Sequence, residues 1–339
     1  MTYTIEKVTT LIGARRYGDR DGNVGFILTD SRSLCFPEET LFFALKSERN
    51  DGHNYIPELY RRGVRNFVVS QVPKGYASDY PEANFLKVVN TLEALQRLAE
   101  RHRDEFNIPI VGITGSNGKT MVKEWLHQLL SPSMFVTRSP RSYNSQIGVP
   151  LSVWLLNEQT QVGVFEAGIS QPGEMLALRD IIQPTIAVLT YLGAAHQENF
   201  ESLEAKCREK IILFHDAETI VYNGDDKTVS GVVNEYKDYK GEKLFWSFRD
   251  TKAPFFVKNV EKKGNLSIIT YIYKGEEDSY SLPFIDEASV TNSIIAAVVS
   301  RRLGLSAEEL DKRMALLEPV AMRLEVKEGQ HGCTLINDS

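Results

Sequence analysis

Cysteine is scarce in this sequence, and long apolar segments are absent. The 339 residues include three cysteines, Cys35, Cys207 and Cys333, which lie far apart. Their odd number argues against a disulfide framework, and none has a metal-type partner two residues away. The longest purely apolar stretch, residues 294–299, is too short to cross a membrane. The N-terminal residues also lack the apolar core of a signal peptide. We therefore expect a soluble protein of the reducing cytoplasm.

An excess of positive charge is also missing. The chain has 39 Lys and Arg against 45 Asp and Glu, a net charge of −6, which disfavours a basic surface for nucleic acid or anionic lipid. We therefore expect neither nucleic acid nor a membrane as a partner. Hydrophobic residues make up 42% and charged residues 25%, which is typical of folded globular proteins. At roughly 100–200 residues per domain, the length predicts two or three domains.

The first 89 residues predict a small α/β domain. Apolar runs at 42–45 and 67–69 are typical of buried strands, and residues 56–62 between them predict a short helix. Residues 91–106 predict an amphipathic helix that is capped by Thr91. We expect this helix to lead from a first domain, residues 1–89, into a second domain, residues 90–320.

Strands and helices alternate in the second domain. Strand patterns occur at 110–113, 162–166, 185–190 and 219–222, with helical patterns between them. This alternation is typical of a parallel sheet that helices cover on both faces. Alternating residues between 243 and 282 predict an antiparallel edge. The predicted fold class is therefore α/β, with a small N-terminal α/β domain and a central domain whose sheet is mostly parallel with an antiparallel edge.

A glycine-rich loop joins the strand at 110–113 to a helix at 120–130. Its sequence is TGSNGKT, which comprises Thr114, Gly115, Ser116, Asn117, Gly118, Lys119 and Thr120. Glycines let backbone N–H groups turn towards an anion, and the helix N-terminus adds partial positive charge. Lys119 would then reach the β- and γ-phosphates of ATP, and the Thr120 hydroxyl would bind Mg²⁺. Because residue 113 is Ile rather than Gly, an ordinary glycine-rich turn with a surface lysine is the alternative.

Three further side chains follow strands or helices of this domain. Glu166 ends the strand at 162–166, at the edge of the sheet where ligands gather, so it is either a Mg²⁺ ligand or the cap of the next helix. His196 follows the next strand and is either a metal ligand or a structural histidine. Lys210 lies on a predicted helix at 203–214, where a lysine is by default a solvated surface charge.

These segments resemble the Mur ligases of peptidoglycan synthesis, over essentially the whole chain. TGSNGKT resembles the ATP loop of that family, and YNSQIGVPL at 143–151 resembles its YNNEIGVPL block. EAG at 166–168 and GAAH at 193–196 resemble its two metal-binding blocks, and NGDD at 223–226 is similar to its N-x-D-D turn. The resemblance implies a ligase that forms a carbon–nitrogen bond and uses ATP and two Mg²⁺ ions to do so.

The resemblance also implies roles for single residues. Asn292 matches an asparagine at the adenine, Arg323 matches an arginine directed at the ATP phosphates, and Asp338 belongs to a further block that binds ATP. Lys210 matches, by its spacing, a lysine that CO₂ carbamylates in this family. The resulting carbamate would hold the second Mg²⁺ together with His196.

Within the family, the N-terminal sequence resembles the branch that joins D-alanyl-D-alanine to UDP-N-acetylmuramoyl-tripeptide. Asp30-Ser31-Arg32 and ALKSERNDGH at 44–53 look like the uridine-nucleotide domain of that branch. This resemblance implies that the UDP-substrate is bound by Ser31, Arg32, Lys46 and Asn144. EAGISQPGE at 166–174 also resembles forms that are fused to an alanine racemase.

The implied reaction has two steps. A substrate carboxylate attacks the γ-phosphoryl group of ATP to give an acyl phosphate, and the amine of D-alanyl-D-alanine then displaces phosphate. Such a reaction needs positioning and charge neutralisation more than a covalent group. The residues implied to be catalytic are Lys119, Glu166, His196 and Lys210.

Two other hypotheses stay open at this point. One is a related ligase, either a tripeptide-forming Mur ligase or an enzyme like folylpolyglutamate synthetase. The other is a nucleotide-binding switch or scaffold without ligase activity. In the family a third domain follows the block to which residues 336–339 are similar. We therefore expect residues 321–339 to be the start of a C-terminal domain, and the chain to be a monomeric fragment that is inactive or poor as a ligase alone.

Overall fold

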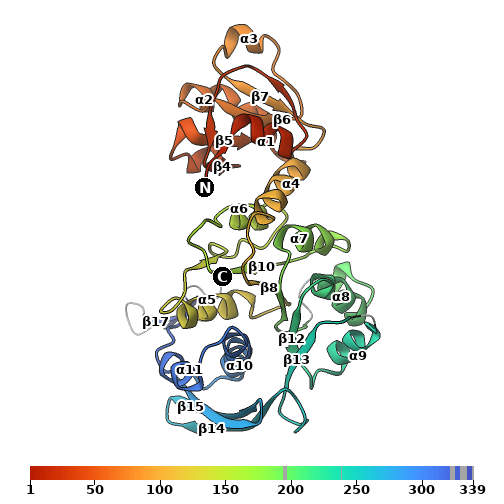
Figure 1. Ribbon diagram of the computed structural model, residues 1–339, viewed down its shortest axis with the longest axis vertical. Helices are drawn as coiled ribbons and strands as arrows, with labels where there is room; N and C mark the ends of the chain where they lie inside the picture. The colour runs from red at the N-terminus through yellow and green to blue at the C-terminus, as the bar shows by residue number, and fades with distance from the viewer. Residues whose placement is uncertain (194–196, 238, 321–324, 329–333, 338–339) are drawn as a thin grey trace. The chain divides into compact units, whose positions relative to one another are not determined.

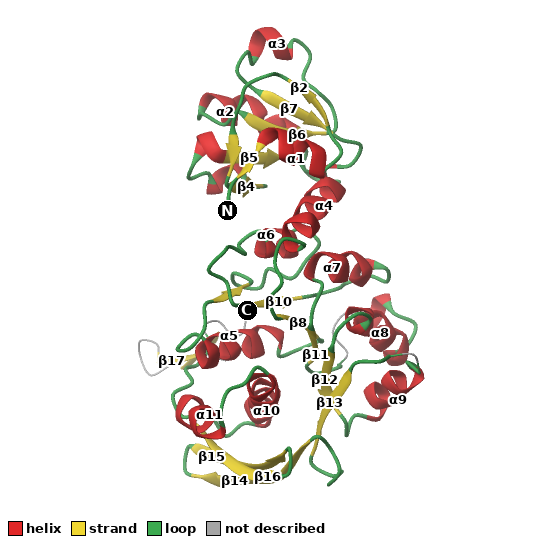
Figure 2. Cartoon of the chain, in the orientation of Figure 1, coloured by secondary structure: helices red, strands yellow, loops and turns green. Residues whose placement is uncertain are grey.

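Two compact units make up the chain in the computed structural model, which describes residues 1–193, 197–237, 239–320, 325–328 and 334–337. Unit 1 consists of Met1–Asn107 and Gln146–Glu158, and unit 2 of Ile108–Ser145 and Gln159–Ser339. Figures 1 and 2 show the elements of each unit. The division differs from the expected boundary at residue 89 because helices α4 (Thr91–Arg103) and α6 (Gly148–Val153) pack against each other in unit 1.

Unit 1 is built on a five-stranded sheet in the order β2-β7-β6-β5-β4. Its strands are β2 (Arg15–Tyr17), β4 (Phe26–Leu28), β5 (Thr40–Phe43), β6 (Asn66–Val69) and β7 (Asn84–Lys87), and a separate antiparallel pair consists of β1 (Tyr3–Thr4) and β3 (Asn23–Val24). The other helices and 3₁₀ turns of this unit are α1 (Ile5–Leu11), α2 (Ile56–Arg61), α3 (Tyr76–Asp79), η1 (Ser31–Ser33), η2 (Pro37–Glu39) and η3 (Gly52–Tyr55). Strands β4 to β7 are parallel, and β2 joins β7 in the antiparallel direction.

The sheet of unit 1 is buried on both faces. Phe42 and Phe67 belong to one apolar cluster, whereas Phe43 and Val68 belong to the other, and all four are fully buried. Successive residues of a strand point to opposite faces, so a continuous apolar run fits a sheet that is covered on both sides. The strands predicted at 42–45 and 67–69 are therefore confirmed as elements. The first is shifted by two residues towards the N-terminus, and the second begins one residue earlier.

Helix α4 begins with a different cap from the one predicted. The Asn90 side chain accepts hydrogen bonds from the backbone N–H groups of Leu92 and Glu93, at 2.9 and 3.3 Å. Thr91 is the first helical residue, and its hydroxyl donates to the Ala44 carbonyl at 3.1 Å. The prediction of Thr91 as the cap was wrong because Asn90, one residue earlier, is an equally good capping residue.

Unit 2 is built on a nine-stranded sheet in the order β16-β15-β14-β13-β12-β11-β8-β10-β9. Its strands are β8 (Ile110–Thr114), β9 (Val136–Arg138), β10 (Val162–Glu166), β11 (Ile186–Leu189), β12 (Thr219–Asn223), β13 (Glu242–Ser247), β14 (Phe255–Lys263), β15 (Leu266–Tyr273) and β16 (Glu276–Leu282), and a separate antiparallel pair consists of β17 (Glu325–Glu328) and β18 (Thr334–Asn337). The neighbours from β9 to β14 run parallel, and β15 and β16 extend the sheet in the antiparallel direction. The predicted mostly parallel sheet with an antiparallel edge is confirmed.

Helices cover both faces of this sheet (Figure 1). The helices and 3₁₀ turns are α5 (Lys119–Leu130), α7 (Glu174–Ile182), α8 (Leu203–Lys210), α9 (Lys227–Glu235), α10 (Glu287–Arg302), α11 (Ala307–Met314), η4 (Gln197–Asn199) and η5 (Ile211–Phe214). Helices α5, α10 and α11 share one apolar cluster with the sheet, whose members include Trp125, Ile294 and Leu310. Figure 1 shows α8 and α9 on the other side of β12 and β13. The predicted helix at 203–214 is α8 followed by the turn η5.

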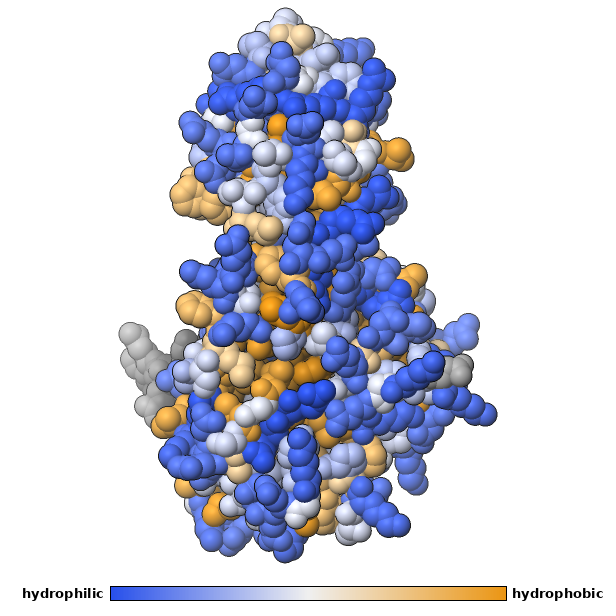
Figure 3. Space-filling model, in the orientation of Figure 1, coloured by the Kyte–Doolittle hydropathy of each residue, from blue (hydrophilic) through white to orange (hydrophobic). Residues whose placement is uncertain are grey.

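Hydrophilic side chains cover most of the face that Figure 3 draws. Among the residues that the structure describes, none of the helices is long and apolar enough to cross a membrane.

Candidate nucleotide and metal site

The glycine-rich loop lies between β8 and α5, as the sequence predicts. Gly115 has a φ of +146° and Gly118 a φ of +86°, conformations that residues with a side chain rarely adopt. A Cβ on Gly118 would lie 2.4 Å from Oδ1 of Asn292 on α10. Glycine at 118 therefore allows both the turn into the helix and the close approach of Asn292. Thr114, before the loop, is fully buried, and its hydroxyl has no hydrogen-bond partner among the described residues.

The end of β11 holds the loop in place. The backbone N–H of Ser116 donates to the Tyr191 carbonyl at 2.6 Å, and the Ser116 hydroxyl donates to the Gly193 carbonyl at 3.0 Å. The Thr190 hydroxyl donates to the Asn117 carbonyl at 2.5 Å. Because β11 lies beside β8 in the sheet, residues more than 70 positions away along the chain fix the backbone of the loop.

A pocket of roughly 670 Å³ opens beside the loop. It is lined by Ser116, Asn117, Gly118, Lys119, Thr120, Met121, Asn144, Tyr191, Glu287, Ala288, Thr291 and Asn292. Asn292 is almost fully buried, and its amide donates to Sδ of Met121 at 3.2 Å. The fold thus brings α10 against the phosphate-loop helix, so that Asn292 and Lys119 line the same cavity although 173 positions separate them.

The Lys119 side chain folds back over the loop. Its Nζ donates to the carbonyls of Gly115 and Ser116, at 2.9 and 3.4 Å. Lys119 lines the large pocket and also a smaller one of roughly 190 Å³, to which Gly115, Asn144 and Lys210 contribute as well. An ammonium held at this position carries positive charge at the edge of both cavities, where an anion would enter.

Glu166 ends β10 next to the first turn of α5. Its carboxylate is fully buried: Oε2 accepts a hydrogen bond from the Thr120 hydroxyl at 3.1 Å, and Oε1 lies 3.1 Å from Nζ of Lys123. The alternative, that Glu166 caps the next helix, does not hold, because Glu209 accepts hydrogen bonds from the backbone N–H groups of Gly173 and Met175 at the start of α7.

The Thr120 and Glu166 oxygens fit a magnesium ion. A hydroxyl oxygen and a carboxylate oxygen that lie 3.1 Å apart form a pair of hard ligands. No three His, Cys, Asp or Glu side chains gather into a metal cage within the described part of the chain. Magnesium is usually held by one or two protein oxygens together with phosphates and water, so the pair is sufficient for such a site.

Lys210 is buried rather than solvated, so the default expectation of a surface charge was wrong. The side chain is 2% exposed, and its Nζ donates to the Gly115 carbonyl at 3.3 Å. Burial, together with the positive charges of Lys119 and Lys206, lowers the pKa of Lys210 to about 7. A large fraction of the Lys210 amine is therefore neutral near neutral pH, which makes it a nucleophile in contact with the phosphate loop.

Three predicted site residues lie outside the described residues. These are His196, Arg323 and Asp338. Their roles remain those that the sequence resemblance implies.

The predicted UDP-substrate residues fall in both units. Ser31 and Arg32 form the turn η1, and Lys46 lies in the loop after β5, all in unit 1. Arg32 forms an ion pair with Asp30 at 2.6 Å and is 87% exposed, while Lys46 lies 3.9 Å from Asp51. The Arg32 guanidinium lowers the pKa of Asp30 to about 2.

Asn144 is different from these residues because it belongs to unit 2. It lines both pockets beside the phosphate loop, and its carbonyl accepts a hydrogen bond from the Gly168 N–H at 2.8 Å. The structure therefore groups Asn144 with the predicted ATP residues.

Several residues that hold or line the site were not predicted from the sequence. Thr190, Tyr191 and Met121 hold or line the loop, and Lys123 contacts Glu166. A sequence signal was available for Lys123, because it lies one helical turn after Lys119 and therefore on the same side of α5. The other three contacts depend on strands and helices meeting in space, for which the sequence offered no local signal.

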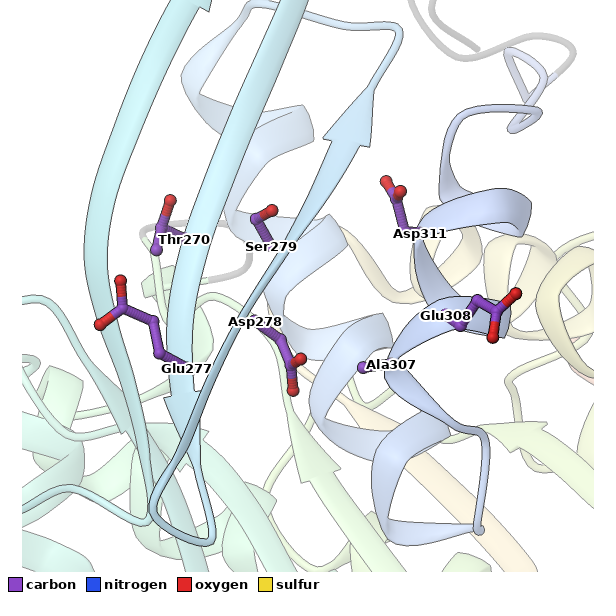
Figure 4. A pocket seen from close by; sticks show the side chains of 7 residues that line it. All are labelled: Thr270, Glu277, Asp278, Ser279, Ala307, Glu308 and Asp311. Carbon is purple, nitrogen blue, oxygen red and sulfur yellow. The ribbon is translucent and has the colours of Figure 1, made fainter.

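A further hollow of roughly 570 Å³ lies between β15, β16 and α11 (Figure 4). Acidic side chains predominate in its lining, which consists of Thr270, Glu277, Asp278, Ser279, Ala307, Glu308 and Asp311. All four acids are already engaged. Glu277 pairs with Lys258 at 2.8 Å and Glu308 with Lys312 at 2.6 Å, Asp278 lies 3.8 Å from Arg301, and Asp311 accepts a hydrogen bond from the Ser281 N–H at 2.9 Å. Of the predicted site residues that the structure describes, none lines this hollow.

Comparison with known families gives two matches. Residues 113–300 match the family described as Mur ligase middle domain, and residues 23–103 match the Mur ligase family, catalytic domain. The first match alone covers more than half of the chain and includes the phosphate loop, Glu166 and Lys210.

Individual proteins are similar over most of the chain. The UDP-N-acetylmuramoyl-tripeptide--D-alanyl-D-alanine ligase of Bacillus subtilis (strain 168) is 29% identical over 92% of this chain and 66% of its own length. The crystal structure of MurF ligase from Thermotoga maritima in complex with ADP has a TM-score of 0.78 at 25% identity, covering 92% of this chain and 70% of its own. A structure of MurF from Acinetobacter baumannii has a TM-score of 0.89 at 23% identity, covering 100% of this chain and 73% of its own, and shows the shared fold. The chain thus spans about two thirds of the length of the relatives that it matches.

Proposed function

This chain belongs to the Mur ligase family, and from that premise we propose that it is an ATP-dependent peptide ligase of peptidoglycan precursor synthesis. Its proposed reaction joins D-alanyl-D-alanine to UDP-N-acetylmuramoyl-tripeptide, as the name of the Bacillus subtilis relative states for that protein. The observation that carries the proposal is the convergence of Lys119, Thr120, Glu166 and Lys210 on one glycine-rich loop at the end of β8. Since ATP drives the proposed reaction, we place the protein in the cytoplasm.

The pocket beside α10 is the proposed site of ATP. Backbone N–H groups of Gly115, Asn117 and Gly118 would surround the phosphates, with Lys119 close to their β- and γ-groups. The Ser116 N–H is already bonded to the Tyr191 carbonyl. Asn292 would contact the adenine, because its amide offers both a donor and an acceptor in a nearly closed part of the cavity. We assign Arg323 and Asp338 to the same nucleotide from sequence resemblance.

Magnesium would be held by Thr120 and Glu166, the two neighbouring oxygen ligands. When bound, the ion would neutralise phosphate charge during phosphoryl transfer. A second ion would be held by His196 and by Lys210 as a carbamate. The burial of Lys210 supports this second assignment, because only a neutral amine adds to CO₂ and that addition releases one proton while it creates a carboxylate-like ligand.

The proposed chemistry keeps atoms and charges balanced. A carboxylate oxygen of the UDP-linked peptide attacks the γ-phosphorus, and the bond to the β-phosphate oxygen breaks, releasing ADP. The amine of D-alanyl-D-alanine then attacks the acyl carbon, phosphate leaves, and the amine loses a proton. Lys119 stays bonded to the loop carbonyls, so it can hold the phosphates in line without a large movement.

The UDP-substrate would bind to unit 1 through Ser31, Arg32 and Lys46. Guanidinium and ammonium groups suit the two phosphates of the uridine nucleotide. Both side chains are largely exposed, so they are accessible to a ligand in solution. Asn144 would contact the substrate from beside the phosphate loop in unit 2.

Binding is the first test, because the residues that support the proposal bind ligands directly. Calorimetry of the chain with ATP and Mg²⁺, and separately with UDP-N-acetylmuramoyl-tripeptide, is expected to show saturable binding of each. Lys119→Ala is expected to abolish ATP binding and to spare binding of the UDP-precursor. Lys227, an exposed lysine that also opens a helix, gives the matched control Lys227→Ala, which is expected to bind both ligands normally.

Turnover separates the competing functions. With ATP, Mg²⁺, the UDP-precursor and D-alanyl-D-alanine, any UDP-linked pentapeptide that mass spectrometry detects, even at low yield, would identify the proposed ligase. Product from a single amino acid instead of the dipeptide would identify a tripeptide-forming ligase. ATP binding that is indifferent to the UDP-precursor, without any product, would identify a nucleotide-binding switch. Lack of ATP binding by the unmodified chain would refute the proposal.

A further inference from the structure

Lys123 is a fully buried lysine for which the proposed function leaves no role. It lies on α5, and its ammonium is surrounded by four oxygen atoms. Oε1 of Glu124 and Oε1 of Glu166 lie 2.9 and 3.1 Å away, and Nζ donates to the carbonyl of Ser139 at 2.9 Å and to that of Arg141. A buried ammonium is stable only when it is paired and hydrogen-bonded in this way.

The two oxygens of Glu166 have different neighbours. Oε2 faces the Thr120 hydroxyl, and Oε1 faces Lys123. A carboxylate that is held by one oxygen cannot rotate freely, so its other oxygen stays directed at Thr120. Lys123 therefore fixes the orientation of the group that we assign to magnesium, without contacting the metal position itself.

The same ammonium also holds the segment that leads into the pockets. Its bonds to Ser139 and Arg141 tie that segment to α5, and the Ser139 hydroxyl in turn accepts a hydrogen bond from the Glu166 N–H at 3.2 Å. Arg141 has a φ of +48°, a left-handed conformation that needs support from its surroundings. Asn144, three residues later, lines both pockets.

From this arrangement we propose that Lys123 is a positioning residue for the phosphate-loop magnesium. It holds Oε1 of Glu166 so that Oε2 and the Thr120 hydroxyl form the metal-binding pair. The inference rests on the proposed function, because it requires that magnesium and ATP bind at this loop.

The test compares magnesium affinity in the unmodified chain and in Lys123→Met. Methionine keeps the length and most of the volume of lysine but lacks its charge and its donors. Calorimetric titration of Mg²⁺ at fixed ATP is expected to show a roughly 10–100-fold loss of metal affinity, the effect typical of losing an outer-shell partner. Mn²⁺ titration followed by electron paramagnetic resonance reads the same site without turnover.

Glu124→Gln is the matched control. It removes the other carboxylate that contacts Lys123 but leaves the Lys123–Glu166 pair intact, so the metal affinity is expected to stay unchanged. If Lys123 had a purely structural role, Lys123→Met and Glu124→Gln would show similar metal affinities. Unchanged metal affinity in a folded Lys123→Met variant would overturn the proposal.

A double-mutant cycle covers the case in which Lys123→Met fails to fold. Lys123→Met/Glu166→Gln removes the buried carboxylate charge that the single variant leaves unpaired. If Lys123 acts through Glu166, the double variant is expected to match the magnesium affinity of Glu166→Gln. A further loss in the double variant would contradict that coupling. Absence of Mg²⁺-dependent ATP binding in the unmodified chain would instead refute the proposed function.

Discussion

The two units use the same kind of charge pair in opposite surroundings. In unit 1, Arg32 and Asp30 approach to 2.6 Å while their side chains are 87% and 43% exposed. In unit 2, Lys123 and Glu166 lie 3.1 Å apart, and both side chains are 0% exposed. The first pair is screened by water and free to re-pair with a ligand, whereas the second is fixed by its neighbours.

This contrast indicates how each unit is prepared for its proposed ligand. Exposed ion pairs contribute little to stability, so Arg32 can exchange Asp30 for a phosphate at low cost. Buried charges cost free energy unless every partner is in place, so Lys123, Glu166 and Thr120 form a preorganised set. Unit 1 offers adaptable charges on loops, and unit 2 offers a rigid site at the ends of strands.

The largest expected effect is the loss of the buried pair. Lys123→Met leaves Glu166 without its cation and two backbone carbonyls without a donor, so the free energy of unfolding is expected to fall by about 3–5 kcal/mol. Urea unfolding followed by the fluorescence of Trp125 and Trp246, both buried in unit 2, measures this loss. A loss of unfolding free energy as small as that expected for an exposed ion pair would contradict the proposed difference between the two pairs.

The next largest effect is the loss of stability of unit 1 at acidic pH. His102 on α4 is buried, with its Nδ1 2.8 Å from the Tyr3 hydroxyl and its Nε2 3.0 Å from the Leu156 carbonyl, and burial lowers its pKa to about 4. Between pH 6.5 and 4 the unfolded chain binds the proton and the folded chain does not. Stability from the neutral ring is therefore present above pH 6.5 and is lost as the pH falls towards 4, by on the order of 3 kcal/mol.

The matched variant for this prediction is His102→Gln. Urea unfolding of both proteins across this pH range, followed by the fluorescence of Trp154 in unit 1, is expected to show a steeper loss with acid in the unmodified chain. If the free energy of unfolding fell equally steeply with acid in both proteins, the acid sensitivity of unit 1 would come from its exposed ion pairs instead of buried His102.

A smaller effect is expected from replacing a glycine by alanine. Comparing two glycines distinguishes the cost of a left-handed conformation from the effect of a position inside the site. Gly118 and Gly275 have nearly the same φ, +86° and +83°, but only a Cβ on Gly118 would meet another atom, Oδ1 of Asn292. Both alanine variants are expected to lose about 1–2 kcal/mol from the left-handed conformation. ATP affinity, measured by calorimetry, is expected to fall in Gly118→Ala alone, and an equal fall in both would contradict a local role.

The smallest effect is expected at the exposed pair. Asp30→Asn removes the acid that pairs with Arg32, and the urea midpoint of unit 1 is expected to stay unchanged because water replaces the carboxylate. Calorimetry with the UDP-precursor shows whether Arg32 still binds without its partner. If Asp30→Asn lost as much stability as Lys123→Met, the exposed pair and the buried pair would not differ in the way we expect.

Local patterns in the sequence were sufficient for much of the fold. The strand, glycine-rich loop and helix around Lys119 are where they were predicted, and an antiparallel edge follows β14 within the predicted range 243–282. Apolar periodicity, glycine and capping residues act over a few positions, so a local pattern can indicate them. The cap of α4 was misplaced by one residue because Asn90 and Thr91 are chemically similar in this role.

The long-range contacts of the site were beyond such patterns. The helix of Lys210, taken alone, indicated a solvated side chain, because nothing in it signals that Nζ contacts Gly115, 95 positions away. Only the family resemblance identified Lys210 as a site residue. The same reason explains why the contact of Asn292 with the loop helix had no local signal.

The sequence by itself determined the phosphate loop, the α/β class and the position of Glu166 at a strand end. The tertiary structure alone decided which side chains meet there. Strand β8 lies between β10 and β11, so Glu166 and Thr190 reach the loop from two sides. That strand order depends on the packing of the whole sheet, and it is the packing that buries Lys123 and Lys210 and gives their charges a function.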